Sequence, residues 1–490
     1  MRLSNLIEKI EYKVLLGSLD TEVSSLVYDS RKVEDGSVFI CIKGTTVDGH
    51  QYIDDVIAKG AKAIVVEESF DADISKYDGV TFISAKDNRV SLAYMSAAFF
   101  GYPAKSLKTI GVTGTKGKTT TTYVVKSILE GAGIKCGLIG TIETIVGDKR
   151  TPNSNTTPES YLVQKYFKEM VDAGLEAVVM EVSSQAMLMN RVAGIEFDLG
   201  VFTNLEPDHI GENEHKDFAD YMYCKSLLFR QCKVGVFNSD SEHIEGILKG
   251  HTCEVITYGL NEGADYQAAN TRLVTLKGAL GVGYEVKGKR NLNVEVNQPG
   301  IFSIYNSLCA IAICDQFGIK DDILREALTH ITVKGRIEMI HVSDDFTLMI
   351  DYAHNAMALE SLLTTLKAYN PGRLVTLFGC GGNRAKSRRY EMGEVSSRLS
   401  DLTIVTSDNP RNEEPMDIIA DILIGVKKCD GEYVTIPDRK EAIKYAIENG
   451  KPGDIIVLAG KGHEDYQEIK GVKHHMDERE LIAEILEELA

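Results

Sequence analysis

A glycine-rich run between Thr113 and Thr119 carries the strongest chemical signal in the sequence. It reads T-G-T-K-G-K-T, follows a short apolar stretch and precedes a segment with helical periodicity. Glycines let backbone N–H groups approach phosphate oxygens closely, and the start of a helix adds partial positive charge. Lys118 can then reach the β- and γ-phosphates, and the Thr119 hydroxyl is placed to contact Mg²⁺. The run predicts a nucleoside triphosphate site.

The match to the common phosphate-loop pattern is incomplete, because Val112 stands where that pattern has its first glycine. A glycine-rich turn that only caps a helix is the alternative. The four threonines at 119–122 are weak helix formers. They are easier to accommodate at a helix start if a bound anion stabilises it, which favours the nucleotide site.

Two later strand-like stretches, 176–182 and 197–205, also end in polar residues. Ligands of open α/β sheets bind at the carboxyl ends of the strands. Glu181 at such an end suits Mg²⁺, which prefers oxygen ligands. His209 follows the second stretch, and Lys225 lies on a predicted helix. Taken alone, these two are a polar loop residue and a solvated surface lysine.

The elements that must position these residues alternate between strands and helices. One alternation begins near Leu107 and a second begins after Arg336. Such alternation predicts largely parallel sheets covered by helices. At roughly 150 residues per domain, three domains are expected. We predict an α/β fold with a smaller N-terminal α/β domain (1–105), a central phosphate-loop, parallel-sheet domain (106–334) and a C-terminal Rossmann-like domain (335–490).

Composition excludes several function classes. The 490 residues are 43% hydrophobic, enough for folded cores, and carry a net charge of −18. Such an acidic chain is unsuited to sequence-independent nucleic-acid binding or to anionic membranes. No apolar run reaches the roughly 18 residues of a membrane span, and the start has no apolar core of a signal peptide. Nine scattered cysteines predict buried, reduced thiols in the cytoplasm.

The phosphate loop resembles that of the Mur ligases and folylpolyglutamate synthetases, whose pattern is T-G-T-N-G-K-[TS]. Lys116 replaces the usual Asn, a mild change if that position contributes mainly its backbone. The resemblance covers nearly the whole chain. The residues that it implies for ATP are Thr113, Gly114, Thr115, Lys116, Gly117, Lys118, Thr119, Asn306 and Arg336.

The same resemblance implies a site for a uridine-nucleotide sugar peptide. Part of it is the N-T-T-P loop at 155–158, for which a helix cap before Glu159 is the alternative. The implied contacts are Tyr28, Ser30, Thr45, Thr46, Val47, Asn155, Thr156, Thr157, Ser183 and Arg191.

Catalytic and metal roles also follow from the resemblance. It implies that Lys118, Glu181, His209 and Lys225 are catalytic, and that Thr119, Glu181, His209 and Lys225 hold Mg²⁺. Lys225 would do so as a carbamate formed with CO₂. That reaction turns a cation into an anionic oxygen donor, whereas a bare ammonium beside Mg²⁺ would be repelled.

Three runs in the last part of the chain each follow a predicted strand. They are GCGGNR (379–384), DNPR (408–411) and GKGHEDYQ (460–467), and we expect them to converge on one face of the sheet. A simple turn is the alternative for DNPR. The runs resemble family members that add meso-diaminopimelate, which implies a pocket of Arg384, Asp408, Asn409, Pro410, Arg411, Gly460 and Glu464.

The chemistry of that pocket is selective. Meso-diaminopimelate differs from lysine by a second carboxylate, which the guanidinium of Arg411 can bind with two parallel hydrogen bonds. With lysine bound, Arg411 would lose that partner, and an unpaired buried charge discriminates strongly.

The resemblance implies an ATP-dependent amide ligase. It would join meso-diaminopimelate to the D-Glu carboxylate of UDP-MurNAc-L-Ala-D-Glu through an acyl-phosphate, as a cytoplasmic monomer in peptidoglycan precursor synthesis, with only small molecules as partners. The alternatives are a sister ligase that adds L-lysine or another amino acid, a folylpolyglutamate synthetase, and a nucleotide kinase or ATP-binding regulator without ligase chemistry.

Overall fold

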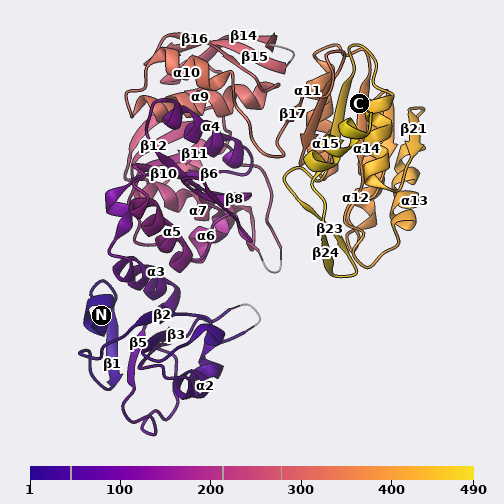
Figure 1. Cartoon of the computed structure of the whole chain (residues 1–490). Coiled ribbons are helices and arrows are strands. Elements are labelled where there is room, and N and C mark those ends of the chain that lie inside the picture. The colour runs from indigo at the N-terminus through magenta and orange to yellow at the C-terminus, as the bar shows by residue number, and fades with distance from the viewer. Residues whose placement is uncertain (45–46, 212–213, 277–278, 490) are drawn as a thin grey trace. The chain divides into compact units, whose positions relative to one another are not determined.

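The computed structural model describes residues 1–44, 47–211, 214–276 and 279–489. Figure 1 labels its helices and strands. The chain divides into two compact units. The first comprises Met1–Asp265 and Cys309–Lys320, and the second comprises Tyr266–Leu308 and Asp321–Ala490. The α/β class with mainly parallel sheets is confirmed, whereas the predicted boundaries at 105/106 and 334/335 remain predictions.

The N-terminal sheet has five strands in the order β1-β5-β4-β3-β2, and only β1 is antiparallel to its neighbour. Alternate residues of a strand face opposite sides of the sheet. Side chains such as Val65 therefore pack with α1 and α3, while Ile64 packs with α2 on the other face. The elements are β1 (Tyr12–Leu16), β2 (Ser25–Val27), β3 (Ser37–Ile40), β4 (Ala63–Glu67), β5 (Thr81–Ala85), α1 (Leu3–Leu6), α2 (Ile53–Ala58) and α3 (Asn88–Phe99).

The central sheet of the first unit runs in the order β13-β12-β11-β6-β10-β7-β8-β9. Its strands are parallel except for the β8-β9 hairpin, which the sequence analysis did not anticipate. The strands are β6 (Lys108–Thr113), β7 (Cys136–Ile139), β8 (Glu143–Val146), β9 (Lys149–Pro152), β10 (Ala177–Glu181), β11 (Phe197–Phe202), β12 (Cys232–Asn238) and β13 (Glu254–Gly259). The helices are α4 (Lys118–Gly131), α5 (Ser160–Asp172), α6 (Ser184–Leu188), α7 (Phe218–Ser226) and α8 (Ile244–Leu248).

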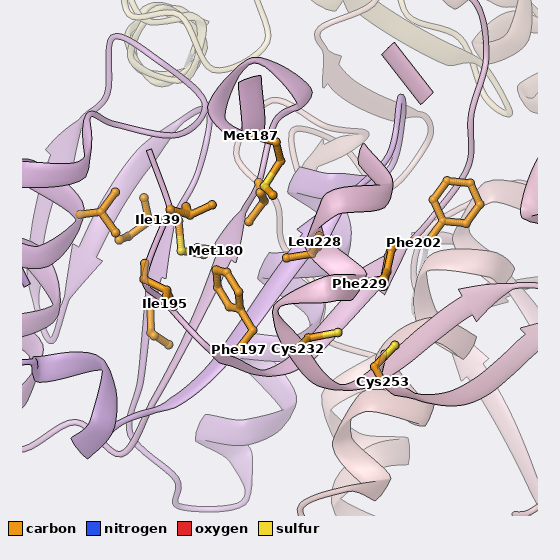
Figure 2. Close-up of a cluster of buried hydrophobic side chains, with 14 of the residues drawn as sticks. Ile139, Met180, Met187, Ile195, Phe197, Phe202, Leu228, Phe229, Cys232 and Cys253 are labelled. Atoms are coloured by element: carbon orange, nitrogen blue, oxygen red, sulfur yellow. The ribbon is translucent and has the colours of Figure 1, made fainter. Parts of the chain in front are cut away.

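The register of the central sheet aligns the carboxyl ends of β6, β10 and β11. Val112 of β6 lies opposite Glu181 of β10 and Val201 of β11. The polar residues that follow these strands are therefore brought to one edge of the sheet. A continuous apolar core holds the strands in place, and Figure 2 shows part of it, including Met180 and Phe197.

The second unit contains an antiparallel segment and a six-stranded sheet in the order β17-β18-β22-β19-β20-β21, in which only β17 is antiparallel. The strands are β14 (Tyr266–Leu276), β15 (Ala279–Gly288), β16 (Leu292–Val296), β17 (Glu338–Ile340), β18 (Thr347–Asp351), β19 (Leu374–Phe378), β20 (Leu402–Val405), β21 (Glu432–Thr435), β22 (Ile455–Ala459), β23 (Tyr466–Ile469) and β24 (Val472–His475).

Helices cover both faces of the six-stranded sheet, as a doubly wound unit requires. Leu363 and Met392 belong to the apolar cluster on one face, and Ile443 and Ile482 belong to the cluster on the other. The helices of this unit are α9 (Ile301–Asp315, part of which belongs to the first unit), α10 (Asp321–Leu328), α11 (Ala356–Lys367), α12 (Lys386–Leu399), α13 (Pro415–Val426), α14 (Arg439–Glu448) and α15 (Glu478–Leu489).

Most of the cysteines are buried, as the sequence predicted. Eight cysteines are buried as free thiols, but Cys429 is partly exposed because it follows the end of α13. Across the described ranges, none of the helices combines the length and apolar character that a membrane span needs.

Candidate functional site

The phosphate loop joins β6 to α4. Gly117 precedes the helix with a φ of 83°, a left-handed conformation that glycine adopts without steric cost. The Lys118 ammonium donates to the carbonyl oxygens of Gly114 at 2.7 Å and Thr115 at 3.0 Å. The lysine therefore lies on the loop itself, where its charge can serve a bound phosphate.

Lys116 contributes its backbone to the loop. Its N–H donates to Asn204 Oδ1 at 2.8 Å, and its carbonyl oxygen accepts from the Thr203 hydroxyl at 2.7 Å. Its side chain also pairs with Glu206 at 2.6 Å. The loop is thus fastened to the segment after β11, through partners that sequence reasoning had not singled out for this purpose.

Gly114 leaves no room for a side chain. Its φ is +149°, and a Cβ atom would overlap the Thr203 hydroxyl and lie 3.1 Å from the Asn204 backbone nitrogen. We expect Gly114→Ala to lower the free energy of unfolding by about 1–3 kcal/mol, as overpacking does. Urea unfolding measures this. Gly133→Ala is the control, since Gly133 also has a positive φ but open space around it; an equal loss in both variants would refute a steric cause.

Glu181 is fully buried at the end of β10. Its carboxylate accepts from the Thr119 hydroxyl at 2.9 Å and from both the backbone N–H and the hydroxyl of Thr141, at 2.8 and 3.0 Å. Thr141, which the sequence analysis missed, follows β7 at the same edge of the sheet. Thr119 and Glu181, two of the four predicted metal ligands, are therefore adjacent.

Lys225 is buried on α7, so the surface alternative is wrong for this residue. Its ammonium donates to the Gly114 carbonyl at 2.8 Å and lies 4.4 Å from the centre of the Tyr221 ring. Burial, together with the nearby Lys118, holds the pKa of Lys225 well below its usual value. The Tyr221 hydroxyl lies 3.0 Å from that of Thr115. Helix α7 thus brings Lys225 against the phosphate loop.

His209 lies at the margin of this group. Its side chain is about half exposed, and its ring nitrogen lies 3.1 Å from Glu214. The ring centre is 6.1 Å from that of Tyr221. Within the described residues, His209 forms no hydrogen bond with Thr119 or Glu181, so its metal role stays a prediction.

The N-T-T-P loop is tied to the end of β10. The Thr157 hydroxyl donates to the Glu181 carbonyl at 2.8 Å and accepts from the Ser183 N–H at 3.0 Å. Arg191 donates to Glu159 at 2.8 Å and to the Thr157 carbonyl at 3.0 Å. Helix α5 has Glu159 as N-cap without a side-chain cap, so the helix-cap alternative is wrong.

Other predicted contacts for the sugar peptide lie in the same unit. Thr156 bonds to Thr141 at 3.1 Å, while Asn155 is exposed. Tyr28 lies 6.0 Å from Tyr161 of α5 between ring centres, and burial raises its pKa to about 12. Ser30 begins a short 3₁₀ helix, and Val47 is exposed. Thr45 and Thr46 lie outside the described residues.

A cavity of about 290 Å³ opens in the second unit. It lies at the carboxyl ends of β18, β19, β20 and β22, whose last residues are aligned by register. The three runs predicted to converge do meet here. Among the predicted residues, those that line the cavity are Arg384, Asp408, Asn409, Arg411, Gly460 and Glu464. Pro410 does not line it, and its role stays a prediction.

Charged groups of both signs line this cavity. Arg411, at a φ of 51°, donates to Glu468 at 3.2 Å and to the Gly382 carbonyl at 2.7 Å, and its side chain is about a quarter exposed. The expectation that it would be a buried, unpaired charge without the distal carboxylate is therefore wrong. Arg384 forms no ion pair with any described residue, whereas Arg389 is buried and paired with Glu413. The cavity can thus offer guanidinium groups to a carboxylate.

Lys461, which the sequence analysis did not select, supports two residues that line the cavity. It is fully buried and donates to Asn409 Oδ1 and to Glu464, both at 3.0 Å. Asn409 in turn donates to Glu464 at 2.9 Å. These bonds fix a carboxylate that can receive an ammonium group. The only sequence signal for Lys461 was its place within the run GKGHEDYQ.

Two predicted ATP contacts, Asn306 and Arg336, belong to the second unit. Asn306 is half-buried on α9. The Arg336 guanidinium stacks on Tyr352 at 4.7 Å. Their contact with nucleotide therefore stays a prediction.

Comparisons with known proteins agree with these observations. Three domain families match: "Mur ligase family, catalytic domain" over 22–100, "Mur ligase middle domain" over 112–314, and "Mur ligase, glutamate ligase domain" over 335–462. The chain is 42% identical over 492 residues to the UDP-N-acetylmuramoyl-L-alanyl-D-glutamate–2,6-diaminopimelate ligase 1 of Clostridium acetobutylicum, covering all of both proteins. It is 40% identical to the ligase of that name from Clostridioides difficile, again at full coverage.

Solved structures give the same result. A diaminopimelate ligase structure matches with a TM-score of 0.74 and 28% identity, covering 100% of this chain and 99% of that one. The MurF ligase of Thermotoga maritima in complex with ADP shares the fold, with a TM-score of 0.59 and 18% identity over 97% of this chain and 100% of that one. The chain therefore belongs to the Mur ligase family.

Proposed function

We propose that this protein is the ATP-dependent ligase that adds meso-diaminopimelate to the D-Glu carboxylate of UDP-MurNAc-L-Ala-D-Glu. The proposal includes action in the cytoplasm, as a monomer, with small molecules as its only partners. One observation carries it: full-length similarity to ligases named for this reaction, in a chain where all the residues predicted to bind the amino acid except Pro410 line one cavity.

The residues around Glu181 fit Mg²⁺. Among the residues that the structure describes, no lysine or arginine forms an ion pair with this fully buried carboxylate. A buried carboxylate without a cationic partner is costly, and a hard cation with oxygen ligands would compensate it. Thr119 and Glu181 would hold the ion, joined by His209 and by Lys225 as a carbamate. Bound Mg²⁺ would supply charge neutralisation for the transferring phosphoryl group.

The chain's own groups account for the remaining chemistry. The loop 113–119 would bind the ATP phosphates through backbone N–H groups and Lys118. A D-Glu carboxylate oxygen attacks the γ-phosphorus, the bond to ADP breaks, and an acyl-phosphate forms. The amine of diaminopimelate then attacks the acyl carbon, inorganic phosphate leaves, and the amine loses a proton. Lys118 would stabilise the negative charge that develops in these steps.

The second-unit cavity would select the amino acid. Arg411 and Arg384 would bind the distal carboxylate, and Glu464, held by Lys461, would bind an ammonium group. Asn306 and Arg336 would contact the nucleotide. The loop 155–158, with Tyr28, Ser30, Ser183 and Arg191, would hold the sugar peptide.

Release of ADP tests the proposal. We expect purified protein to release ADP only with ATP, UDP-MurNAc-L-Ala-D-Glu and meso-diaminopimelate together, and to form the tripeptide product by mass spectrometry. Turnover with L-lysine alone would identify a sister ligase, and turnover with folate and glutamate a folylpolyglutamate synthetase. Release without an amine would indicate a kinase, and ATP binding without turnover a regulator.

A further inference from the structure

A second cavity, of about 480 Å³, lies in the first unit away from the groups described above. Lys108, the first residue of β6, lines it, whereas the phosphate loop follows Thr113 at the other end of that strand. At about 3.3 Å per residue, the two lie roughly 16 Å apart along the strand. The cavity therefore opens at the amino ends of the central strands, opposite the ligase chemistry.

Gln164 gives this cavity a polar group without a partner. It lies on α5 and is only 2% exposed, and it lines the cavity. Its Oε1 atom accepts no hydrogen bond from the described residues. Buried acceptors are nearly always bonded, so this one is suited to a donor brought by a ligand.

Two of the four lysines that line the cavity form no ion pair with a described residue. Lys9 and Lys105 lie over the ring of Tyr102, at 4.8 and 5.1 Å from its centre, and neither forms an ion pair with a described residue. By contrast, the neighbouring Lys108 and Lys233 share the carboxylate of Asp198. The free pair can therefore bind an anionic group without first breaking an ion pair.

The lining also contains the carboxylates of Glu176, Glu196 and Asp198, and the remainder is largely apolar and aromatic. Ala97 and Leu107 are buried in the wall, and Tyr94 and Tyr102 both line the cavity. A Cβ atom at Gly194 would lie 2.8 Å from the Tyr94 ring, so the absence of a side chain there lets the ring lie against the backbone. Such walls suit a flat, apolar ligand body.

We propose that this cavity binds a small organic anion: a carboxylate or phosphate held by Lys9 and Lys105, an apolar or aromatic body beside Tyr94 and Tyr102, and a hydroxyl or amide donor for Gln164. The site is independent of the ligase reaction. It combines residues of the N-terminal part with residues of the central sheet, so an occupant bridges the two and stabilises the unit.

Calorimetric titration of the full chain with 4-hydroxybenzoate tests the site. This probe has the anion, the ring and the donor; 4-hydroxybenzyl alcohol lacks the charge and benzoate lacks the donor. We expect 4-hydroxybenzoate to bind saturably. The affinity for 4-hydroxybenzyl alcohol should be at least about tenfold lower, because a charged hydrogen bond is lost. Gln164→Leu should abolish the preference for 4-hydroxybenzoate over benzoate.

A matched pair of variants decides the location. The double variant Lys9→Ala, Lys105→Ala should bind 4-hydroxybenzoate at least about tenfold more weakly, while its rate of ADP release stays unchanged. The control, Lys13→Ala with Lys86→Ala, removes the same charge from exposed positions outside the cavity and should bind normally. The proposal would be overturned if 4-hydroxybenzoate showed no saturable binding below ~10 mM. It would also be overturned if the cavity variant lost less than about tenfold in affinity, or if the control variant lost as much affinity as the cavity variant.

Discussion

Replacement of Lys225 by alanine is expected to reduce the rate of ADP release by about 10³-fold, the loss seen when a group that stabilises transition-state charge is removed. The side chain is buried, and its nitrogen lies 2.8 Å from the Gly114 carbonyl. As a carbamate it would place anionic oxygens beside the phosphate loop. Lys225→Arg keeps a cation but cannot form the carbamate, so it should be as inactive as the alanine variant.

The dependence of activity on bicarbonate distinguishes a carbamylated Lys225 from an unmodified lysine. Wild-type activity should fall in buffer depleted of CO₂ and return when bicarbonate is added, while Lys225→Arg stays inactive in both. Lys216→Ala, at an exposed position that precedes the same helix, is the control and should keep full activity. A crystal structure of the Mg²⁺-loaded enzyme with an unmodified Lys225 amine would contradict the carbamate.

The sequence was sufficient to predict which polar runs lie close together. Each polar run follows an apolar strand, and parallel strands bring such runs to one edge of a sheet. In the central sheet, the register that places Val112 opposite Glu181 confirms that such runs meet at one edge. In the C-terminal sheet, the cavity of about 290 Å³ that the three runs line confirms the same arrangement. These arrangements depend on local periodicity, which the sequence displays directly.

Partners that are distant in the chain could not be predicted in this way. Thr141 meets Glu181 across 40 residues, and Lys461 meets Asn409 across 52. Neither pair belongs to one periodic segment. Lys225 shows the same limit: its helix was predicted, but periodicity in a short helix did not reveal that its lysine faces inward.

Arg411→Ala is expected to lower kcat/KM for meso-diaminopimelate by ~10²-fold, since two charge-assisted hydrogen bonds to a carboxylate contribute about 3 kcal/mol. Activity with L-lysine, which has no distal carboxylate, should change little. The ratio of the two kcat/KM values therefore measures the role of Arg411 without depending on overall activity. Arg398→Ala, which removes an exposed arginine paired with Glu360 on the same unit, should leave both values unchanged.

Glu468 provides a second test of the role of Arg411. In the structure it already accepts from Arg411 at 3.2 Å, so the guanidinium is held in place before substrate arrives. Glu468→Gln keeps the shape but removes the charge, and should raise KM for meso-diaminopimelate more than it lowers kcat, because the arginine is less firmly oriented for binding. If Arg411→Ala lowered activity with lysine and diaminopimelate equally, Arg411 would support the fold of the cavity and another group, such as Arg384, would read the distal carboxylate.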